Sequence, residues 1–501
     1  MTAAPQPPLI LALDVGTSST RTILFDRDAQ MVEGQEVKRP YRLRTTPDGG
    51  VEADADEVVA IAADAIDEAL RIAGPLAGSI AAVGISCFWH SLLGIDRDGR
   101  ALTPVYSWAD TRSAAAADAL RAELDEGDLH DRVGTVFHTS YWPAKLRWLR
   151  ETEPELARRV ARWIGYGEYL LLRLCDHLAC SYAMASGTGL FDQHALDWYA
   201  PLLDHLGLDP ARLPPLVDRD DAGARLAGEY ARRWPALARV PWFPAVGDGA
   251  CNNVGSGCVT PDRMALSIGT SGVMRVVVPT EELVIPRQVW CYRLDRRRYV
   301  LGGALSNAGN VVDWLRSSTR LPEDAAAQVA AVPPDSHGLT VLPYLAGERS
   351  PDWNPRARGA VAGLALDTTP VQLLRAALEA VAYRFALIHE LLRPLAAKDY
   401  RIICSGGAVE HWPVWPQIIA DALGEPLTAS QELEASARGA ALLALDSLGA
   451  LPNLALAETP LGRTYRPDHD AHATYRRARA RLEWLGAVLT PDRLSAAPPR
   501  T

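Results

Sequence analysis

The sequence predicts an α/β protein in which two related domains face one another across a central cleft. Two similar nine-residue stretches, ALDVGTSST at 12–20 and ALSIGTSGV at 265–273, are identical at five positions. Apolar, β-branched runs flank both copies, and strand and helix patterns alternate after each of them, which is typical of α/β domains. A unit that recurs at about half the chain length indicates two domains, because a solenoid would repeat every roughly 20–50 residues.

The first copy lies in a predicted hairpin. Residues 9–15 form one apolar strand, GTSST forms a tight turn, and residues 21–26 form a second strand. A Walker or Rossmann phosphate loop would be followed by a helix, so this turn belongs to neither type. Helical spacing of apolar residues at 57–72 and a buried apolar run at 80–85 predict the next helix and strand.

The second copy repeats this plan, with strands predicted at 264–268 and 275–278 around GTSGV. We therefore expect a domain boundary near Val246, domains at 1–246 and 247–480, and a frayed tail at 481–501. The other elements expected are a strand at 298–301, a long helix at 369–392, a strand at 401–404, a helix that begins near 411–415 and a small-residue helix at 434–448.

The composition excludes several classes of function. The net charge is −10 without runs of like charge, so nothing indicates a nucleic-acid partner or a polybasic membrane contact. No segment approaches about 18 uninterrupted apolar residues and the N-terminus lacks a signal-peptide pattern, so we expect no membrane partner. The seven cysteines are scattered without zinc-type spacing, which favours reduced thiols in a cytoplasmic protein.

The two turns predict a site for a polyphosphate. Backbone N–H groups in such turns point into a small concavity that cradles an anion, so two turns on facing domains can hold the two ends of a nucleoside triphosphate. Only the first copy carries an acid, Asp14, where the second has Ser267. Mg²⁺ binds phosphates together with one or two carboxylates, which makes Asp14 the candidate metal ligand. The alternative is that Asp14 only caps a turn.

Phosphoryl transfer also needs a group that accepts the proton of the attacking hydroxyl. Asp248 is the candidate general base, because it lies between two glycines in PAVGDGACNNVGSG, after an apolar run and at the expected domain junction. Glycines on both sides let the backbone approach a ligand closely. The alternative is again an aspartate that serves only the turn.

Five motifs, in this order, resemble the FGGY carbohydrate kinases: ALDVGTSSTRTILFD, GDGACNNVG, SIGTSGV, GGALSNAGNVVDWL and CSGGAVEHWPVWPQIIAD. The resemblance implies two ribonuclease-H-like (actin-like ATPase) domains with ATP and a sugar in the cleft. It implies that Asp248 is the general base and that Asp14 is the acid associated with magnesium. The other nucleotide-binding residues that it implies are Gly16, Thr17, Ser18 and Arg21 in the first turn, Gly269, Thr270 and Ser271 in the second, Gly309 near the β- and γ-phosphates, and Gly406, Gly407 and His411 in the adenosine motif.

Within that family, GISCFWHSL, SWADTRSA, GTVFHTSYWPAKLRWL, ASGTGLFD and LPYLAGERSPDWNPRARG resemble the gluconate kinases most, although Trp89 replaces a usual Met. Asp, His and Trp recognise polyols, and the carboxylate of a sugar acid calls for a cation. The alternative for each residue is structural, as a core aromatic or a surface ion pair. The substrate residues expected are Trp89, His90, Trp108, Asp110, His138, Lys145, Asp248 and Arg349.

The expected activity is therefore Mg²⁺-ATP-dependent phosphorylation of a primary hydroxyl of a small sugar or sugar acid, first of all D-gluconate to 6-phosphogluconate. One alternative is xylulose kinase or a kinase of another ketose or polyol. The alternative from another class is a nucleotide switch like actin or the chaperone ATPases, which hydrolyses ATP without a sugar. A homodimer is compatible with all three.

Overall fold

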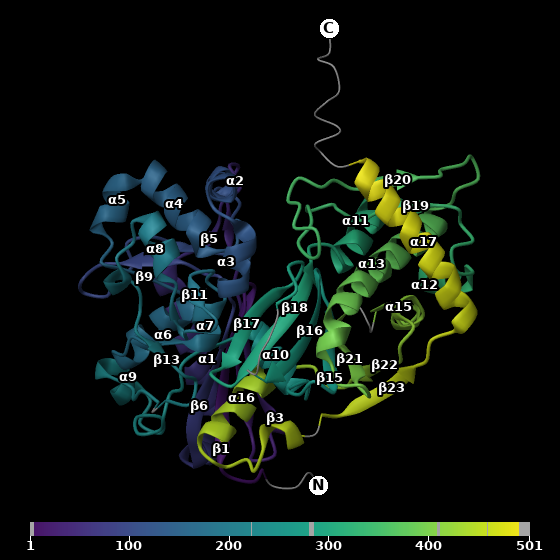
Figure 1. Cartoon of the computed structure of the whole chain (residues 1–501). Coiled ribbons are helices and arrows are strands. Elements are labelled where there is room, and N and C mark those ends of the chain that lie inside the picture. The colour runs from purple at the N-terminus through teal and green to yellow at the C-terminus, as the bar shows by residue number, and fades with distance from the viewer. Residues whose placement is uncertain (1–4, 222, 280–284, 408–410, 458, 490–501) are drawn as a thin grey trace.

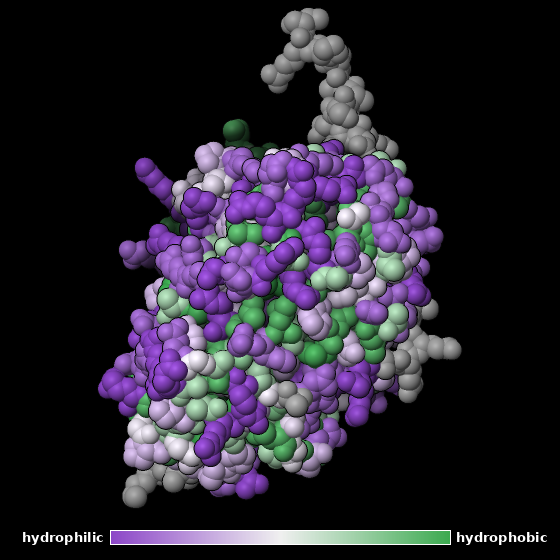
Figure 2. Space-filling view, turned by 90° about the vertical axis from the view of Figure 1, so that its left-hand side faces the viewer, coloured by the Kyte–Doolittle hydropathy of each residue, from purple (hydrophilic) through white to green (hydrophobic). Residues whose placement is uncertain are grey.

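The computed structural model describes residues 5–221, 223–279, 285–407, 411–457 and 459–489. It has two α/β halves side by side, the N-terminal half in purple and blue and the C-terminal half in green and yellow (Figure 1). Hydrophilic side chains cover much of the outer face of the N-terminal half, with hydrophobic ones between them (Figure 2). None of the described helices is long and apolar enough to span a membrane.

The N-terminal half is built on a five-stranded sheet in the order β14-β6-β1-β2-β3. Its strands are β1 (Leu9–Val15), β2 (Ser19–Phe25), β3 (Met31–Pro40), β6 (Ile80–Cys87) and β14 (Val246–Gly247). β1 and β2 form the predicted antiparallel hairpin, and β1 pairs with β6 in parallel. Helix α1 (Ala55–Ala73) packs against β2 and β3. It begins at the N-cap Asp54, whose carboxylate accepts two backbone N–H groups.

The C-terminal half is built on a seven-stranded sheet in the order β17-β18-β16-β15-β21-β22-β23. Its strands are β15 (Arg263–Ile268), β16 (Gly272–Pro279), β17 (Trp290–Asp295), β18 (Arg298–Leu305), β21 (Arg401–Ser405), β22 (Leu427–Ser430) and β23 (Leu461–Tyr465). β15 and β16 are antiparallel, whereas β15 and β21 are parallel. The order β22-β21-β15-β16-β18 thus repeats the plan of the first sheet, as the duplicated sequence predicts.

The repeat extends to single residue pairs. Asp14 on β1 is the register partner of Ser86 on β6. Ser267 on β15 is the register partner of Ser405 on β21 in the same way. The two copies therefore place Asp14 and Ser267 at equivalent points of their sheets, and the two register pairs differ only in the acid of the first.

The first core continues beyond the expected boundary at Val246. Helices α10 (Asp248–Gly255) and α16 (Ala435–Ser447) pack on each other and on the first sheet, and their buried side chains belong to the same apolar cluster as β1 and β6. Glycine permits the close crossing, because a Cβ at Gly439 would lie 1.9 Å from the Cys251 carbonyl oxygen. The C-terminal half therefore returns a helix to the N-terminal core (Figure 1).

The remaining elements surround the two sheets. In the N-terminal half they are β4 (Arg44–Thr45), β5 (Val51–Ala53), β7 (Leu93–Ile95), β8 (Val105–Tyr106), α2 (Ala114–Glu123), α3 (Glu126–Val133), α4 (Trp142–Thr152), α5 (Pro154–Arg159), β9 (Arg162–Ile164), α6 (Tyr166–Cys175), β10 (Cys180–Ser181), α7 (Tyr182–Ser186), β11 (Phe191–Asp192), β12 (Asp197–Trp198), α8 (Ala200–Leu206), β13 (Leu216–Val217) and α9 (Gly228–Arg233). In the C-terminal half they are α11 (Gly309–Ser318), α12 (Ala325–Ala331), β19 (Thr340–Leu342), β20 (Ala360–Ala362), α13 (Pro370–Leu392), α15 (Trp415–Leu423) and α17 (His469–Val488).

One sequence expectation needs correction at the C-terminal end. The tail was expected from residue 481, but α17 continues to Val488 and buries Leu482 against the second core. An amphipathic helix with few large apolar residues is hard to separate from a polar tail by sequence alone. Residues 490–501 of the expected tail lie outside the described residues.

Candidate active site

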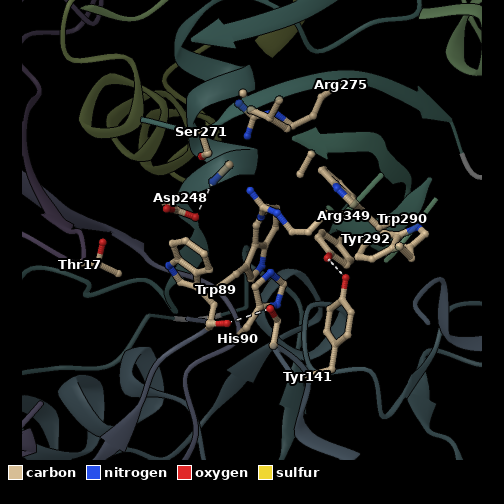
Figure 3. A pocket seen from close by; sticks show the side chains of 17 residues that line it. Thr17, Trp89, His90, Tyr141, Asp248, Ser271, Arg275, Trp290, Tyr292 and Arg349 are labelled. Carbon is tan, nitrogen blue, oxygen red and sulfur yellow. Dashed lines mark hydrogen bonds between the residues drawn. The ribbon is translucent and has the colours of Figure 1, made fainter. Parts of the chain in front are cut away.

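A cavity of about 260 Å³ lies between the two halves of the molecule (Figure 3). The N-terminal half contributes the segments after β1 and β6, whereas the C-terminal half contributes β16, β17 and the loop after β19. The lining residues are Thr17, Trp89, His90, Trp108, Ser140, Tyr141, Asp248, Gly249, Ser271, Gly272, Val273, Arg275, Trp290, Tyr292, Ala304, Arg349 and Trp353. Seven residues expected from the sequence therefore lie around one space: Thr17, Trp89, His90, Trp108, Asp248, Ser271 and Arg349.

Asp248 is the first residue of α10 and lies at the wall of this cavity. Its Oδ1 accepts the backbone N–H of Gly249 at 2.8 Å. Burial, and secondarily the negative charge of Asp14, raise the pKa of the Asp248 carboxyl to about 6. A carboxylate whose pKa lies near neutrality is suited to general-base chemistry, because it is ionised at pH 7 yet holds a proton readily.

Trp89 fixes the position of Asp248. Its indole N–H donates to the Ala183 carbonyl at 2.9 Å, and its ring packs against both glycines that flank the acid. A Cβ at Gly247 would lie 1.9 Å from the indole ring, and a Cβ at Gly249 would lie 2.6 Å from it. The glycines of the GDG motif are therefore required by a close approach of the backbone to Trp89.

Asp14 lies at the end of β1 with 6% of its surface exposed. Ser86 Oγ donates to Asp14 Oδ1 at 2.6 Å, and the Arg21 guanidinium lies 3.7 Å from Oδ2. Arg21 also pairs with Glu434 at 3.2 Å. Burial raises the pKa of Asp14, so its ionised form is under-compensated. A carboxylate of this kind fits a divalent cation held together with phosphates.

Each of the two GTS turns is closed by the N–H of its glycine, but the first turn is one residue longer than the second. The N–H of Gly16 donates to the Ser19 carbonyl, and the N–H of Gly269 donates to the Ser271 carbonyl, each at 3.0 Å. Helix α11 starts against the second turn, because the N–H of Gly309 donates to the Gly269 carbonyl at 2.9 Å. A helix N-terminus beside a backbone turn is a favourable place for an anion.

The expected adenosine motif lies at the end of β21, next to the second turn. A Cβ at Gly406 would lie 2.3 Å from the carbonyl oxygen of Ile268, the residue before Gly269. The exposed His411 donates a ring N–H to the Gly407 carbonyl at 2.6 Å. Residues 408–410 of the motif lie outside the described residues.

The opposite part of the cavity is lined by His90 and aromatic rings. His90 has a φ of 68°, an uncommon backbone conformation for a residue other than glycine. Its Nδ1–H donates to the Gly187 carbonyl at 2.5 Å. Burial lowers the pKa of the imidazole to about 3, so Nε2 is a neutral acceptor for a substrate hydroxyl. Tyr141 and Tyr292 share a hydrogen bond of 2.7 Å across the two halves.

Arg349 is a half-buried cation in the same part of the cavity. Its guanidinium donates to the Leu305 carbonyl at 3.1 Å and lies 5.4 Å above the Trp108 ring centre. Its Nε is buried, and within the described part of the chain it has no hydrogen-bond partner. Burial lowers the pKa of this guanidinium, and only two tyrosines partly compensate. An anionic ligand group would supply the missing partner.

Three expected substrate residues do not line the cavity. Asp110 binds the Arg112 guanidinium through both carboxylate oxygens and accepts the N–H of Val51 at 3.2 Å. The Lys145 ammonium donates to the carbonyls of Thr139 and Ser140, and burial lowers its pKa to about 7. The ring of His138 accepts the N–H of Ser140. Lys145 and His138 thus hold the loop at 139–140, whereas Asp110 holds Val51 and Arg112. Contact of these three side chains with the substrate stays a prediction.

Sequence reasoning missed Arg275, Trp290 and Tyr292, which line the cavity from the second sheet. Trp290 and Tyr292 do not stand out in the sequence as site residues, because aromatic residues are common in strands. Arg275 does give one, because it is the only charged residue in the apolar strand β16, GVMRVVVP, directly after the second turn.

The repeated strand order and the cavity between two such sheets place the protein among the two-domain, actin-like (ribonuclease-H-like) ATPases. Two family models match it: the N-terminal domain of the FGGY family of carbohydrate kinases over residues 9–255, and the C-terminal domain of the same family over residues 264–447. The chain belongs to the FGGY family of carbohydrate kinases.

The chain is 30% identical to a gluconokinase of Bacillus subtilis (strain 168) over 93% of both chains. It is 29% identical to a xylulose kinase of Escherichia coli (strain K12), over 96% of this chain and 99% of that one. Among solved structures it is similar to a gluconate kinase from Lactobacillus acidophilus, with a TM-score of 0.88, 26% identity and coverage of 97% and 99%. These likenesses confirm the predicted family and the predicted fold.

Proposed function

We propose that this carbohydrate kinase transfers the γ-phosphoryl group of ATP to the primary hydroxyl of a small sugar acid, D-gluconate, giving 6-phosphogluconate. The observation that carries the choice of substrate is Arg349, a half-buried guanidinium at the cavity wall that forms no ion pair within the described part of the chain. A neutral ketose would leave this cation without a counter-charge, whereas the carboxylate of a sugar acid would supply one.

In this proposal the sugar lies between Asp248 and Arg349. The carboxylate end meets Arg349 beside Trp108, and Nε2 of His90 accepts a hydrogen bond from a hydroxyl of the chain. The primary hydroxyl at the other end lies against Asp248, which takes its proton as the oxygen attacks the γ-phosphorus. Proton removal by a positioned base typically contributes about 10²–10⁴ to the rate.

The two turns would hold the triphosphate, with Thr17 and Ser271 at the cavity wall. Mg²⁺, held through Asp14, would neutralise charge on the phosphates when bound. Approach of the two halves would then exclude water, which otherwise competes as the phosphoryl acceptor.

The first test measures ADP release with Mg²⁺-ATP against gluconate, xylulose, ribulose, glycerol and a blank without sugar. We expect gluconate-dependent turnover well above the blank. Turnover on xylulose alone would favour the ketose alternative, and hydrolysis equal to the blank on every sugar would favour the nucleotide switch.

The substitution Arg349→Met tests the substrate choice more sharply. It keeps the length of the side chain and removes the charge. Hydrogen bonds to charged groups contribute about 1.5–3 kcal/mol, so the KM for gluconate should rise about 10- to 100-fold. The KM for any neutral sugar that the enzyme accepts should change little, and equal rises for both substrates would contradict a carboxylate contact.

A further inference from the structure

Arg275 is a second cation of the cavity, and unlike Arg349 it is buried. It lies at the end where Asp248 is located (Figure 3). Strand β16 carries it out of the second phosphate turn, so its side chain lies between that turn and helix α10. Its Nη2 donates to Asn252 Oδ1 at 2.9 Å and to Ser267 Oγ at 3.4 Å. Ser267 is the residue that replaces the acid of the first copy, so the hydroxyl orients a cation where an acid would neutralise it.

The other end nitrogen, Nη1, lies next to the catalytic turn. A Cβ at Gly249 would be 2.4 Å from Nη1, so glycine after Asp248 leaves the guanidinium the space that it occupies. Among the described residues Nη1 has no hydrogen-bond partner, and the buried Nε has none either. The side chain is thus anchored through one nitrogen, while its remaining N–H groups are unused.

The positive charge of Arg275 is only partly compensated. Burial lowers the pKa of its guanidinium to about 10, and the charge of Asp248 opposes that shift. Among the ion pairs of the described residues there is none between Arg275 and Asp248. An anchored cation with unused donors, beside both the acid and the second turn, is suited to a group on which negative charge develops.

We propose that Arg275 is a further catalytic residue, which binds the phosphoryl group as it passes from ATP to the sugar. The proposal rests on the proposed kinase function of the cavity. In the step, the sugar oxygen forms a bond to the γ-phosphorus, the bond between this phosphorus and the β,γ-bridging oxygen breaks, and ADP leaves. The hydroxyl proton passes to Asp248, and Arg275 donates N–H groups to the oxygens of the transferred group.

The competing explanation is that Arg275, like Arg349, binds a carboxylate of the substrate. The neighbours of Arg275 and Arg349 distinguish the two explanations. The charge of Arg349 acts on His90, His138, Tyr141 and Tyr292. The charge of Arg275 acts on Asp248. Arg275 therefore belongs to the end where the phosphoryl group arrives, and Arg349 belongs to the end where the sugar is recognised.

The experiment compares Arg275→Met, Arg275→Lys and a control, Arg263→Met, with the wild type. Arg263 begins the neighbouring strand β15, donates to the Gly257 carbonyl at 3.1 Å and does not line the cavity. Each variant is assayed on whichever sugar of the panel the wild type phosphorylates. The kcat, the KM for sugar, the KM for ATP and the melting temperature are measured for each.

We expect Arg275→Met to lower kcat about 100-fold or more, as the loss of a donor to a developing charge typically does. Arg275→Lys should recover part of this loss, because charge returns without the fork of donors. Arg263→Met should stay within about twofold of the wild type.

A kcat of Arg275→Met within about fivefold of the wild type, at unchanged melting temperature, would overturn the proposal. So would a loss that is confined to the KM for a charged sugar, which would indicate a carboxylate contact instead. If the wild type phosphorylates no sugar of the panel, the proposed function itself fails first, and that outcome is seen before any variant is made.

Discussion

At the scale of single residues, the charged groups of the cavity lie at two ends that have different surroundings. Asp248 and Arg275 lie at one end beside the two GTS turns, whereas Arg349 and the neutral His90 lie at the other. In both places burial makes a lone charge costly. Among the described residues these charges form no ion pair, whereas buried acids elsewhere pair with arginines, as Glu379 does with Arg375 at 2.6 Å.

Replacing Asp248 by Asn removes the proton acceptor and keeps the shape of the side chain. We expect turnover to fall about 10²–10⁴-fold, because a positioned base contributes about that factor. The circular dichroism spectrum and the melting temperature should remain close to those of the wild type. A variant that retains more than about a tenth of wild-type turnover would remove Asp248 from the role of base.

The pH dependence of kcat/KM reports on the same carboxyl group. Asp248 must be ionised to accept a proton, and its pKa in the free enzyme is raised to about 6. Activity should therefore be level above about pH 7 and fall about tenfold per pH unit below pH 6. A profile that stays level down to pH 5 would contradict this expectation.

Residue type predicted much of this site but not all of it. The motifs predicted that Asp248, His90 and Arg349 lie in the site, because each occurs in a recognisable short stretch of sequence. Lys145 and Asp110 have backbone carbonyls and Arg112 as partners, and such partners come only from the three-dimensional fold. Contact of these two residues with the substrate stays a prediction. Arg275 was missed although one arginine in an apolar strand is a signal of function.

At the scale of elements, the sequence predicts local structure well where one periodicity persists. The hairpin at 9–25 and the helix α13 have the expected places, because alternation and helical spacing are properties of neighbouring residues. The return of α16 to the first core depends on contacts between residues that are about 190 positions apart, such as Ser436 Oγ with the Asp248 carbonyl. No local pattern contains that information.

The crossing of α10 and α16 can be tested at Gly439. Alanine normally stabilises a helix interior relative to glycine by about 1 kcal/mol. Here a Cβ would lie 1.9 Å from a backbone oxygen of α10, and such overpacking costs about 1–3 kcal/mol or more. We expect Gly439→Ala to lower the melting temperature. Gly78→Ala is the matched control, because a Cβ there meets nothing within 4 Å, and equal melting temperatures for both variants would refute the close crossing.

At the scale of the whole molecule, a buried arginine joins the two halves. Arg219 lies in the N-terminal half and pairs with Asp295 of β17 at 3.3 Å and with Asp446 of α16 at 2.5 Å. Its Nη1 also donates to Ser447 Oγ at 3.2 Å. This network lies among three elements of different origin, so it stabilises their relative placement.

Removal of this arginine should weaken the whole chain. Breaking a buried ion pair from one side costs about 3–5 kcal/mol. Here Asp446 loses its ion-pair partner, whereas Asp295 keeps Arg298. We therefore expect Arg219→Met to lower the melting temperature in scanning calorimetry. The exposed Arg225, which among the described residues donates to the carbonyls of Gly223 and Ala224, provides the control Arg225→Met. A shift no larger than that of the control would argue against the network.

The matched pairs Asp14–Ser86 and Ser267–Ser405 also have a consequence for the sense in which a ligand can lie. A scaffold made of two equivalent halves is nearly symmetrical, so a chain of phosphates could bind to it in either of two opposite orientations. The two halves differ at this point, because one carries the carboxylate of Asp14 and the other carries the hydroxyl of Ser267, which accepts from Arg275. This difference distinguishes the two orientations. The different residue types at these two equivalent positions thus give a nearly symmetrical frame a direction.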